Sequence, residues 1–182
     1  MFKQEITIKD GRKLIVKEAV GSEAKELVRY IAAVGGESDF LTFGANEFNV
    51  SVKEEEALLK TFLESDNQIM LVGWLQNEIV GCIAFRAGKW LRVRHSGEFG
   101  ISVSKKYWGM GIGSHMLSVL IAWAQQTGIV RKINLRVRSD NDRAIAVYKK
   151  LGFVQEGVIT REFMIDGEFY DNIWFGLALD EI

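Results

Sequence analysis

The chain has 182 residues, 48% of them hydrophobic, and its 23 basic and 24 acidic side chains leave a formal net charge of -1. A chain of this length can bury one continuous core, so we expect a single domain over residues 1–182. A near-neutral charge gives no field that would draw the protein to nucleic acid or to an anionic membrane, so we expect neither partner.

Cysteine usage and hydropathy exclude further classes of protein. Cys82 is the only cysteine, which rules out a disulfide framework and a cysteine-rich metal site, and we expect no metal. Residues 1–6 lack the apolar core of a signal peptide, and no segment approaches the roughly 18 apolar residues of a membrane helix. These features predict a cytoplasmic protein, for which a homodimer is one oligomeric state that we consider.

The pattern of apolar residues predicts an α/β fold. Period-two alternation marks strands, a 3.6-residue period marks helices, and glycine or Asp-Gly steps separate them. The resulting order is ββααβββαβαββ, a mixed central β-sheet flanked by helices. In chain order we expect strands around 6–8 and 14–16, helices at 22–36 and 51–62, strands at 68–75, 79–86 and 98–104, a helix at 111–127, a strand at 131–138, a helix at 141–151 and a hairpin that turns at 166–167.

Capping residues mark several of these helix ends. Ser22 is expected to cap the first helix, while Ser51 and Glu54 have the spacing of a capping box in front of the second. Asn141 is expected to cap the last helix, and Gly152 fits the left-handed position that follows it.

The most informative segment leads from a strand through a glycine-rich turn into a helix. Gly109, Gly111 and Gly113 occupy alternate positions in this turn. Without Cβ atoms there, the backbone can approach a ligand closely, while free amides and the positive helix end attract an anion. A phosphate or pyrophosphate suits this geometry. A plain strand-to-helix turn is the alternative, and the glycines alone do not decide between the two.

Other nucleotide-binding turns fit the segment less well. A P-loop is excluded because no Gly-Lys-Ser/Thr closes the turn. A Rossmann turn requires Gly-x-Gly-x-x-Gly and an acidic residue near the end of the next strand, whereas here the spacing is Gly-x-Gly-x-Gly and that strand ends in Arg138. A nucleotide-binding oxidoreductase therefore stays a weaker alternative.

Two motifs together resemble the GNAT superfamily of N-acetyltransferases. Trp108-Gly109-Met110-Gly111-Ile112-Gly113 resembles its acetyl-CoA signature, Gln/Arg-x-x-Gly-x-Gly/Ala. The segment 141–153 resembles its Asn-x-x-Ala-x-x-x-Tyr-x-x-x-Gly-Phe helix. Trp108 stands where Gln or Arg is usual, and Ser104 where many members have proline. With Trp108 at this position, the chain resembles the branch of ribosomal-protein N-terminal alanine acetyltransferases and related bacterial small-molecule enzymes. Because that branch acts on both kinds of acceptor, the resemblance does not identify the acceptor.

The resemblance implies the GNAT-like acyl-CoA N-acyltransferase fold, with acetyl-CoA as co-substrate. The strand that ends at Val103 would pair with pantetheine, and the Val103 amide would face the thioester oxygen. The glycine turn would hold the pyrophosphate. The residues that the resemblance implies for cofactor binding are Ile101, Ser102, Val103, Trp108, Gly109, Met110, Gly111, Ile112, Gly113, Ser114, Asn141, Ala144, Tyr148 and Lys150.

The resemblance also implies a catalytic role for Tyr148, whose hydroxyl would protonate the departing CoA thiolate; a packed aromatic is its other interpretation. The attacking amine must lose a proton, so some base is required. Glu98 is the nearest candidate, although strand parity sets it opposite Phe99, and a solvated strand-end carboxylate is an equal alternative. Neither His95 nor His115 is obviously placed for this role.

Acetyl transfer to a primary amine of a small molecule or a protein N-terminus is the function that these motifs favour. We expect the acceptor to contact the irregular segment 37–50 and the last hairpin. A GNAT domain that binds an acyl-CoA without turnover is the main alternative, and the presence of Tyr148 argues against it.

Overall fold

The computed structural model describes residues 2–179, so residue 1 and residues 180–182 of the expected domain lie outside the described residues. Its helices and strands follow the predicted order, with short 3-10 helices at Gly21–Glu23 and Lys105–Tyr107. The main elements are β1 (Lys3–Thr7), β2 (Lys13–Glu18), α1 (Ala24–Gly35), α2 (Val52–Leu63), β3 (Ile69–Leu75), β4 (Glu78–Ala87), β5 (Ser96–Val103), α3 (Ile112–Gln126), β6 (Lys132–Arg138), α4 (Asp142–Lys150), β7 (Val154–Ile165) and β8 (Glu168–Ala178).

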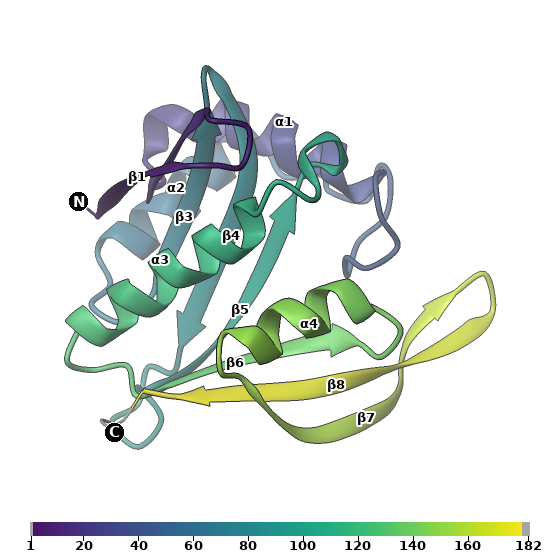
Figure 1. The fold of residues 1–182 in the computed structure, drawn as a ribbon. Helices are drawn as coiled ribbons and strands as arrows, with labels where there is room; N and C mark the ends of the chain where they lie inside the picture. Colours follow the sequence, from purple (N-terminus) through teal and green to yellow (C-terminus); the bar gives the residue numbers. More distant parts are fainter. Residues whose placement is uncertain (1, 180–182) are drawn as a thin grey trace.

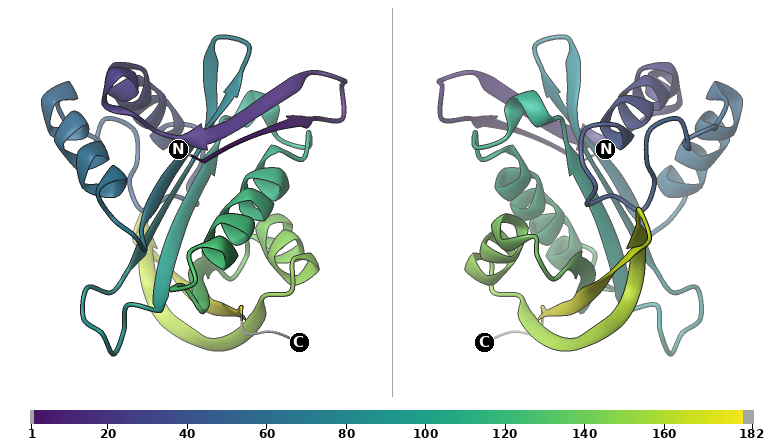
Figure 2. Two further views of the ribbon diagram at one scale, coloured as in Figure 1. Left: turned by 90° about the vertical axis from the view of Figure 1, so that its left-hand side faces the viewer. Right: turned by 90° about the vertical axis from the view of Figure 1, so that its right-hand side faces the viewer.

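The strands form one mixed sheet in the order β1-β2-β3-β4-β5-β6-β8-β7. Each neighbouring pair is antiparallel except β5 and β6, which run parallel. Helices α1 and α2 pack over β3 and β4 on one face, while α3 and α4 lie on the other face (Figures 1 and 2). The predicted α/β class and mixed sheet are therefore confirmed.

Two apolar clusters fill the spaces between the sheet and its helices. The larger lies under α3 and α4 and includes Phe85, Met116 and Phe175, each without measurable exposure. The smaller lies under α1 and α2, around Leu27 and Leu59. Burial of this apolar area is the main favourable contribution to folding, and it holds the helices against both faces.

Helix starts follow the predicted capping chemistry at two of three sites. The Ser51 hydroxyl accepts from the Glu54 amide at 3.2 Å, and the Glu54 carboxylate accepts from the Ser51 amide at 2.8 Å, which confirms the capping box. The expectation for Ser22 is wrong, because this residue lies inside the first 3-10 helix. The Glu23 carboxylate accepts from the amide of Val20, which precedes this 3-10 helix.

Neither a membrane helix nor a metal centre is found in the part of the chain that the structure describes. None of its helices has the length and hydropathy to cross a bilayer, and its His, Cys, Asp and Glu side chains form no cluster able to hold a metal ion.

The feature that positions the site is the separation of β5 from β6. The two strands pair only where Ser96–Glu98 lies beside 132–134. Beyond that point β5 stays paired with β4 as far as Val103, whereas β6 stays paired with β8 as far as Arg138. A wedge-shaped gap therefore opens toward the C-terminal ends of β5 and β6 (Figure 1).

Two glycines of β5 provide a matched test of this packing. A methyl group at Gly97 would lie 2.5 Å from the Arg86 carbonyl oxygen, whereas one at Gly100 would meet no described atom within 4 Å. Gly97→Ala should therefore lower the free energy of unfolding by about 1 to 3 kcal/mol, the usual cost of overpacking. Gly100→Ala should change it by less than about 1 kcal/mol, because the methyl group has room. Urea unfolding of both variants measures the difference, and equal destabilisation would contradict the packing around Gly97.

Candidate cofactor and acceptor site

The backbone of β5 turns unpaired groups into the gap. Ser104 donates its amide to the Val80 carbonyl at 3.0 Å, in register with the β4–β5 ladder. In an antiparallel ladder, alternate residues direct their backbone groups to the same neighbour. Ile101 and Val103 therefore direct their N–H and C=O groups away from β4 and into the gap. This orientation agrees with the expectation that a free amide at Val103 faces a ligand there.

The glycine turn lies beside this gap and opens α3. Gly109 and Gly111 have φ values of +86° and +85°, a left-handed conformation that other residues adopt at a cost. Gly111 is the N-cap of α3, and no side chain of the described residues caps that helix end. A Cβ atom at Gly113 would lie 3.8 Å from its nearest neighbour, a methyl carbon of Val103, so a methyl group fits there without a clash. Exposed amides at a helix N-terminus fit a phosphate group.

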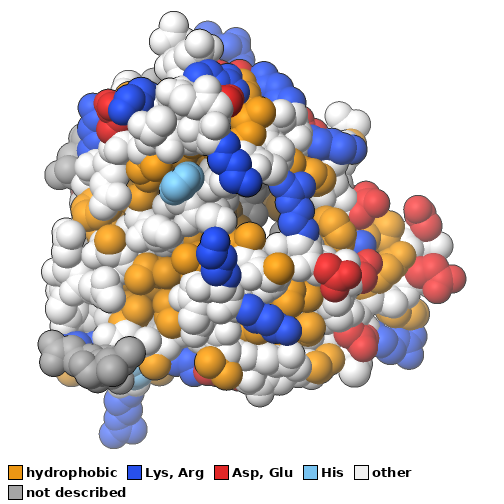
Figure 3. All heavy atoms as spheres, in the orientation of Figure 1, with side chains coloured by type: hydrophobic (Ala, Val, Ile, Leu, Met, Phe, Trp, Pro, Cys, Tyr) orange, Lys and Arg blue, Asp and Glu red, His pale blue; other side chains and the backbone are white. Residues whose placement is uncertain are grey.

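Basic side chains surround this turn. Arg143 lies over the Trp108 ring, with 5.4 Å between its guanidinium carbon and the ring centroid. The Arg12 guanidinium is 3.6 Å from the Met110 sulfur, and its charge is paired with Asp10 at 2.6 Å. Lys and Arg side chains gather around the middle of the face that carries α3 and α4 (Figure 3). Their charge favours an anionic ligand at the turn.

Trp108 connects the turn to the cofactor strand. Its indole nitrogen donates to the Val103 carbonyl at 2.7 Å, and 38% of the side chain is exposed. The ring therefore covers one of the two polar groups of Val103 and leaves the amide facing the gap. Trp108 occupies the position of the signature where Gln or Arg is usual. The guanidinium of Arg143 is stacked on its ring and places a positive charge beside this position.

Tyr148 lies on the α3 and α4 side of the sheet in an aromatic cluster. Its ring packs edge-on against Phe99 and Phe153, with centroid distances of 6.1 and 6.0 Å, and it also contacts Phe175. Burial raises the pKa of the Tyr148 hydroxyl to about 12. The hydroxyl is therefore protonated at neutral pH and able to donate a hydrogen bond or a proton.

Glu98 lies on the opposite face of β5, as its parity predicts. Its carboxylate accepts from Arg136 Nε at 2.7 Å and from Nη2 at 3.3 Å, and Arg136 also pairs with Glu162 at 2.5 Å. Ser102 shares this face, where its hydroxyl lies 3.0 Å from that of Tyr30 on α1. The side chains of Glu98, Ser102 and Arg136 thus lie on the face of the sheet that is opposite Tyr148.

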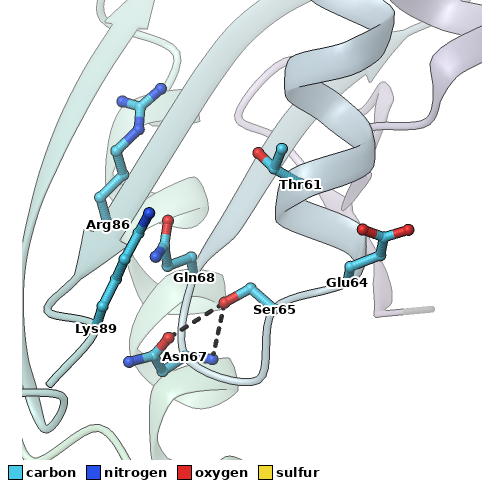
Figure 4. A pocket seen from close by; sticks show the side chains of 7 residues that line it. All are labelled: Thr61, Glu64, Ser65, Asn67, Gln68, Arg86 and Lys89. Atoms are coloured by element: carbon cyan, nitrogen blue, oxygen red, sulfur yellow. Dashed lines mark hydrogen bonds between the residues drawn. The ribbon is translucent and has the colours of Figure 1, made fainter.

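A separate polar hollow of about 600 Å³ lies between α2 and the ends of β3 and β4 (Figure 4). Arg86, which lines it, sits directly across the β4–β5 ladder from Glu98. None of the residues predicted for the site lines this hollow, so it is distinct from the gap.

A family model described as "Acetyltransferase (GNAT) family" matches residues 39–153, which is more than half of the chain. The chain belongs to the GNAT family. The resemblance that its two motifs indicated is therefore confirmed.

Individual GNAT relatives agree with this assignment. A GNAT acetyltransferase from Streptococcus pneumoniae superposes with a TM-score of 0.88 and 36% identity, over 91% of this chain and 98% of that one. The Escherichia coli L-amino acid N-acetyltransferase AaaT is 32% identical over 101 residues, or 56% of this chain and 62% of its own. The chain spans less than two thirds of the first curated relatives that it matches.

A more distant GNAT structure shows the same fold. The yncA protein of Salmonella typhimurium, solved with its cofactor acetyl-CoA, has a TM-score of 0.80 at 18% identity. That alignment covers 93% of this chain and 95% of the Salmonella chain. At this level of identity the likeness shows the fold alone.

The fold brings most of the predicted cofactor residues together around the gap and the turn. The side chain of Ile112 is buried in the core, so only its backbone lies at the turn. Asn141 caps α4, with its oxygen 3.2 Å from the Ala144 amide. Lys150 is exposed near the end of α4.

Sequence reasoning missed Arg12, Arg136 and Arg143. Arg143 lies inside the second motif and could have been singled out there. The other two reach the site through the β1–β2 turn and β6, and no local pattern marks them.

A substitution at Gly113 distinguishes an effect on ligand binding from an effect on folding. Gly113→Ala should raise the free energy of unfolding by up to about 1 kcal/mol, because alanine favours helix and the methyl group has room. The same methyl group should lower CoA affinity by about tenfold if the ligand uses that space. Thermal unfolding and titration calorimetry measure the two effects. Unchanged CoA affinity in a stable variant would place the ligand elsewhere. Gly111→Val is less informative, because its left-handed φ would strain any other residue.

Proposed function

We propose that this chain is an acetyl-CoA-dependent N-acetyltransferase. It transfers the acetyl group to a primary amine of a small molecule or a protein N-terminus, by direct attack in a ternary complex. The observation that carries the proposal is the free amide of Val103, which faces a gap flanked by an uncapped helix N-terminus. The described side chains provide no metal centre, and acetyl-CoA supplies the reaction with an activated acyl group in its thioester.

Binding of the anionic end of acetyl-CoA would fall to the glycine turn and its basic neighbours. The amides that follow Gly111 would hold the pyrophosphate, and Arg143 supplies positive charge beside them. Lys150 is a more exposed candidate for a phosphate contact. The inward-facing backbone groups of Ile101 would bind pantetheine amides as a strand binds its neighbour, while the Val103 carbonyl is already held by Trp108.

The Val103 amide would also stabilise the oxyanion that forms as the amine attacks. One well-placed donor of this kind contributes about 3 kcal/mol in other enzymes. The gap holds both substrates in one place, which removes much of the entropic cost of a reaction between two molecules. In the overall step the carbon–sulfur bond breaks, an amide bond forms, and the amine proton is lost while the thiolate gains one.

Two residues would handle these protons from opposite faces of β5. Tyr148, kept protonated by burial, would donate to the thiolate. Glu98 would accept the amine proton, directly or through water. Both carboxylate oxygens of Glu98 accept from Arg136, so this arginine would orient the base.

The acceptor is best identified by a screen. The protein is incubated with acetyl-CoA and a panel of L-amino acids, spermidine, an aminoglycoside and a peptide with an N-terminal alanine. Mass spectrometry should then detect an acetylated product from one of these classes of amine. L-amino acids belong in the panel because AaaT is named for them. CoA binding without any acetylated product would instead favour a non-catalytic acyl-CoA-binding module. As part of the same proposal, we place the protein in the cytosol and consider a homodimer.

Tyr148→Phe removes the proton donor and keeps the packing of the ring. If Tyr148 protonates the thiolate, kcat should fall by about 10²-fold while the KM for acetyl-CoA changes little. The loss should shrink as the pH falls, because a thiol with a pKa near 8.5 is protonated more readily by solvent there. Steady-state kinetics from pH 6 to 9 measure both effects. Equal kcat values for the two proteins, under conditions in which the chemical step limits turnover, would show that Tyr148 is no proton donor and only packs in the core.

Glu98→Gln and Glu162→Gln form a matched pair, because each removes one carboxylate from Arg136. If Glu98 is the base, Glu98→Gln should lower kcat by about 10²-fold. Glu162→Gln should lower it by no more than about threefold, because Glu162 lies on β7 and away from β5. A similar loss in both variants would indicate that the ion-pair network matters and that Glu98 is no base.

A further inference from the structure

Residues 37–40 cross the open end of the gap, and we call this segment the strap. It follows the C-terminus of α1 and runs toward the N-terminus of α4 (Figure 1). At one end the Glu37 carboxylate accepts from the Lys105 amide at 2.7 Å, directly beyond β5. At the other end the Asp39 carbonyl accepts from Arg138 Nη1 at 3.0 Å, at the last residue of β6. The strap therefore joins the two strands that the gap separates.

Arg138 anchors the strap more firmly than one hydrogen bond would. Its guanidinium carbon lies 4.4 Å from the Phe40 ring centroid and 4.2 Å from that of Tyr170 on β8. The Asp140 carboxylate accepts from its Nε and Nη2 at 2.6 and 2.9 Å. Only 8% of Arg138 is exposed, so it is held between aromatic and acidic partners. A planar guanidinium can make all of these contacts at once, whereas a lysine ammonium cannot.

The chain just before and after the strap is also closely packed. A methyl group at Gly35 would lie 2.9 Å from the Phe43 ring and from the Gly44 carbonyl oxygen, so this part of the loop folds back against the end of α1. The strap is thus a short span with fixed ends, although the segment 37–50 contains neither helix nor strand.

We propose that the strap is a wall that keeps water from the thioester on the acceptor side, and that Arg138 is the positioning residue that holds it. The proposal rests on the proposed function in one respect, the placement of the thioester in the gap. Arg138 lies across the gap from Ser102 and on the same face, where an acceptor would approach. Arg136, two residues earlier on β6, binds Glu98 and Glu162 instead of the strap.

Arg138→Lys and Phe40→Leu test the anchor. In both variants, hydrogen exchange of peptides covering 37–43 should become about tenfold faster, because the strap opens locally more often. Hydrolysis of acetyl-CoA without any amine, which yields acetate and CoA, should rise about fivefold as water reaches the thioester. CoA affinity by calorimetry should stay within about twofold of wild type, because the glycine turn is intact. Phe40 is 38% exposed, so its variant should fold even if the buried arginine tolerates no change.

Arg94→Lys is the matched control. Arg94 pairs with Asp66 and anchors the β4–β5 loop, away from the open end of the gap. It should change neither strap exchange nor hydrolysis.

Unchanged exchange in both strap variants would overturn the anchoring role of Arg138. Faster exchange without faster hydrolysis would overturn the shielding role. Neither measurement needs an acceptor. Failure of wild-type protein to bind CoA would count against the proposed function instead.

Discussion

The site depends on the short parallel contact between β5 and β6. Each strand is held on its outer side by an antiparallel ladder, β5 by β4 and β6 by β8. The two ladders carry the strands apart after Glu98, so the inner backbone groups of Ile101 and the amide of Val103 have no strand beside them, while the Val103 carbonyl accepts from Trp108. Backbone N–H and C=O groups that lack partners are costly to bury, which makes the gap a natural place for a ligand with amide groups of its own.

Strand parity then divides the chemistry between two faces. Phe99 contacts Tyr148 on the side of α3 and α4, while Glu98 and Ser102 point to the other side. The proton donor and the base that we propose are therefore separated by the thickness of one strand. Such a separation suits direct transfer, because the two protons move at different atoms of the reacting centre.

Paired charges build the acceptor face. Arg136 and Arg138 lie two residues apart on β6 and therefore on the same side of the sheet. The first binds carboxylates from β5 and β7, and the second binds Asp140, the strap and two aromatic rings. Because each guanidinium is paired with carboxylates, the side chains of this face are held in fixed positions and their charges largely cancel. The near-neutral charge of the whole chain agrees with this balance.

The sequence by itself determined the order of helices and strands, the glycine turn, the capping box at Ser51 and the family, because each depends on local conformation or on a contiguous motif. Ser22 was misjudged because a short 3-10 helix at Gly21–Glu23 precedes α1, so Ser22 lies inside that helix and not at the N-cap position of α1. Only the tertiary structure decided that Arg136 holds Glu98 and that Arg138 holds the strap, because Arg138 and Asp39 are 99 positions apart in the sequence. The order and register of the strands determine which residues become such partners, and no local sequence pattern predicts that order and register.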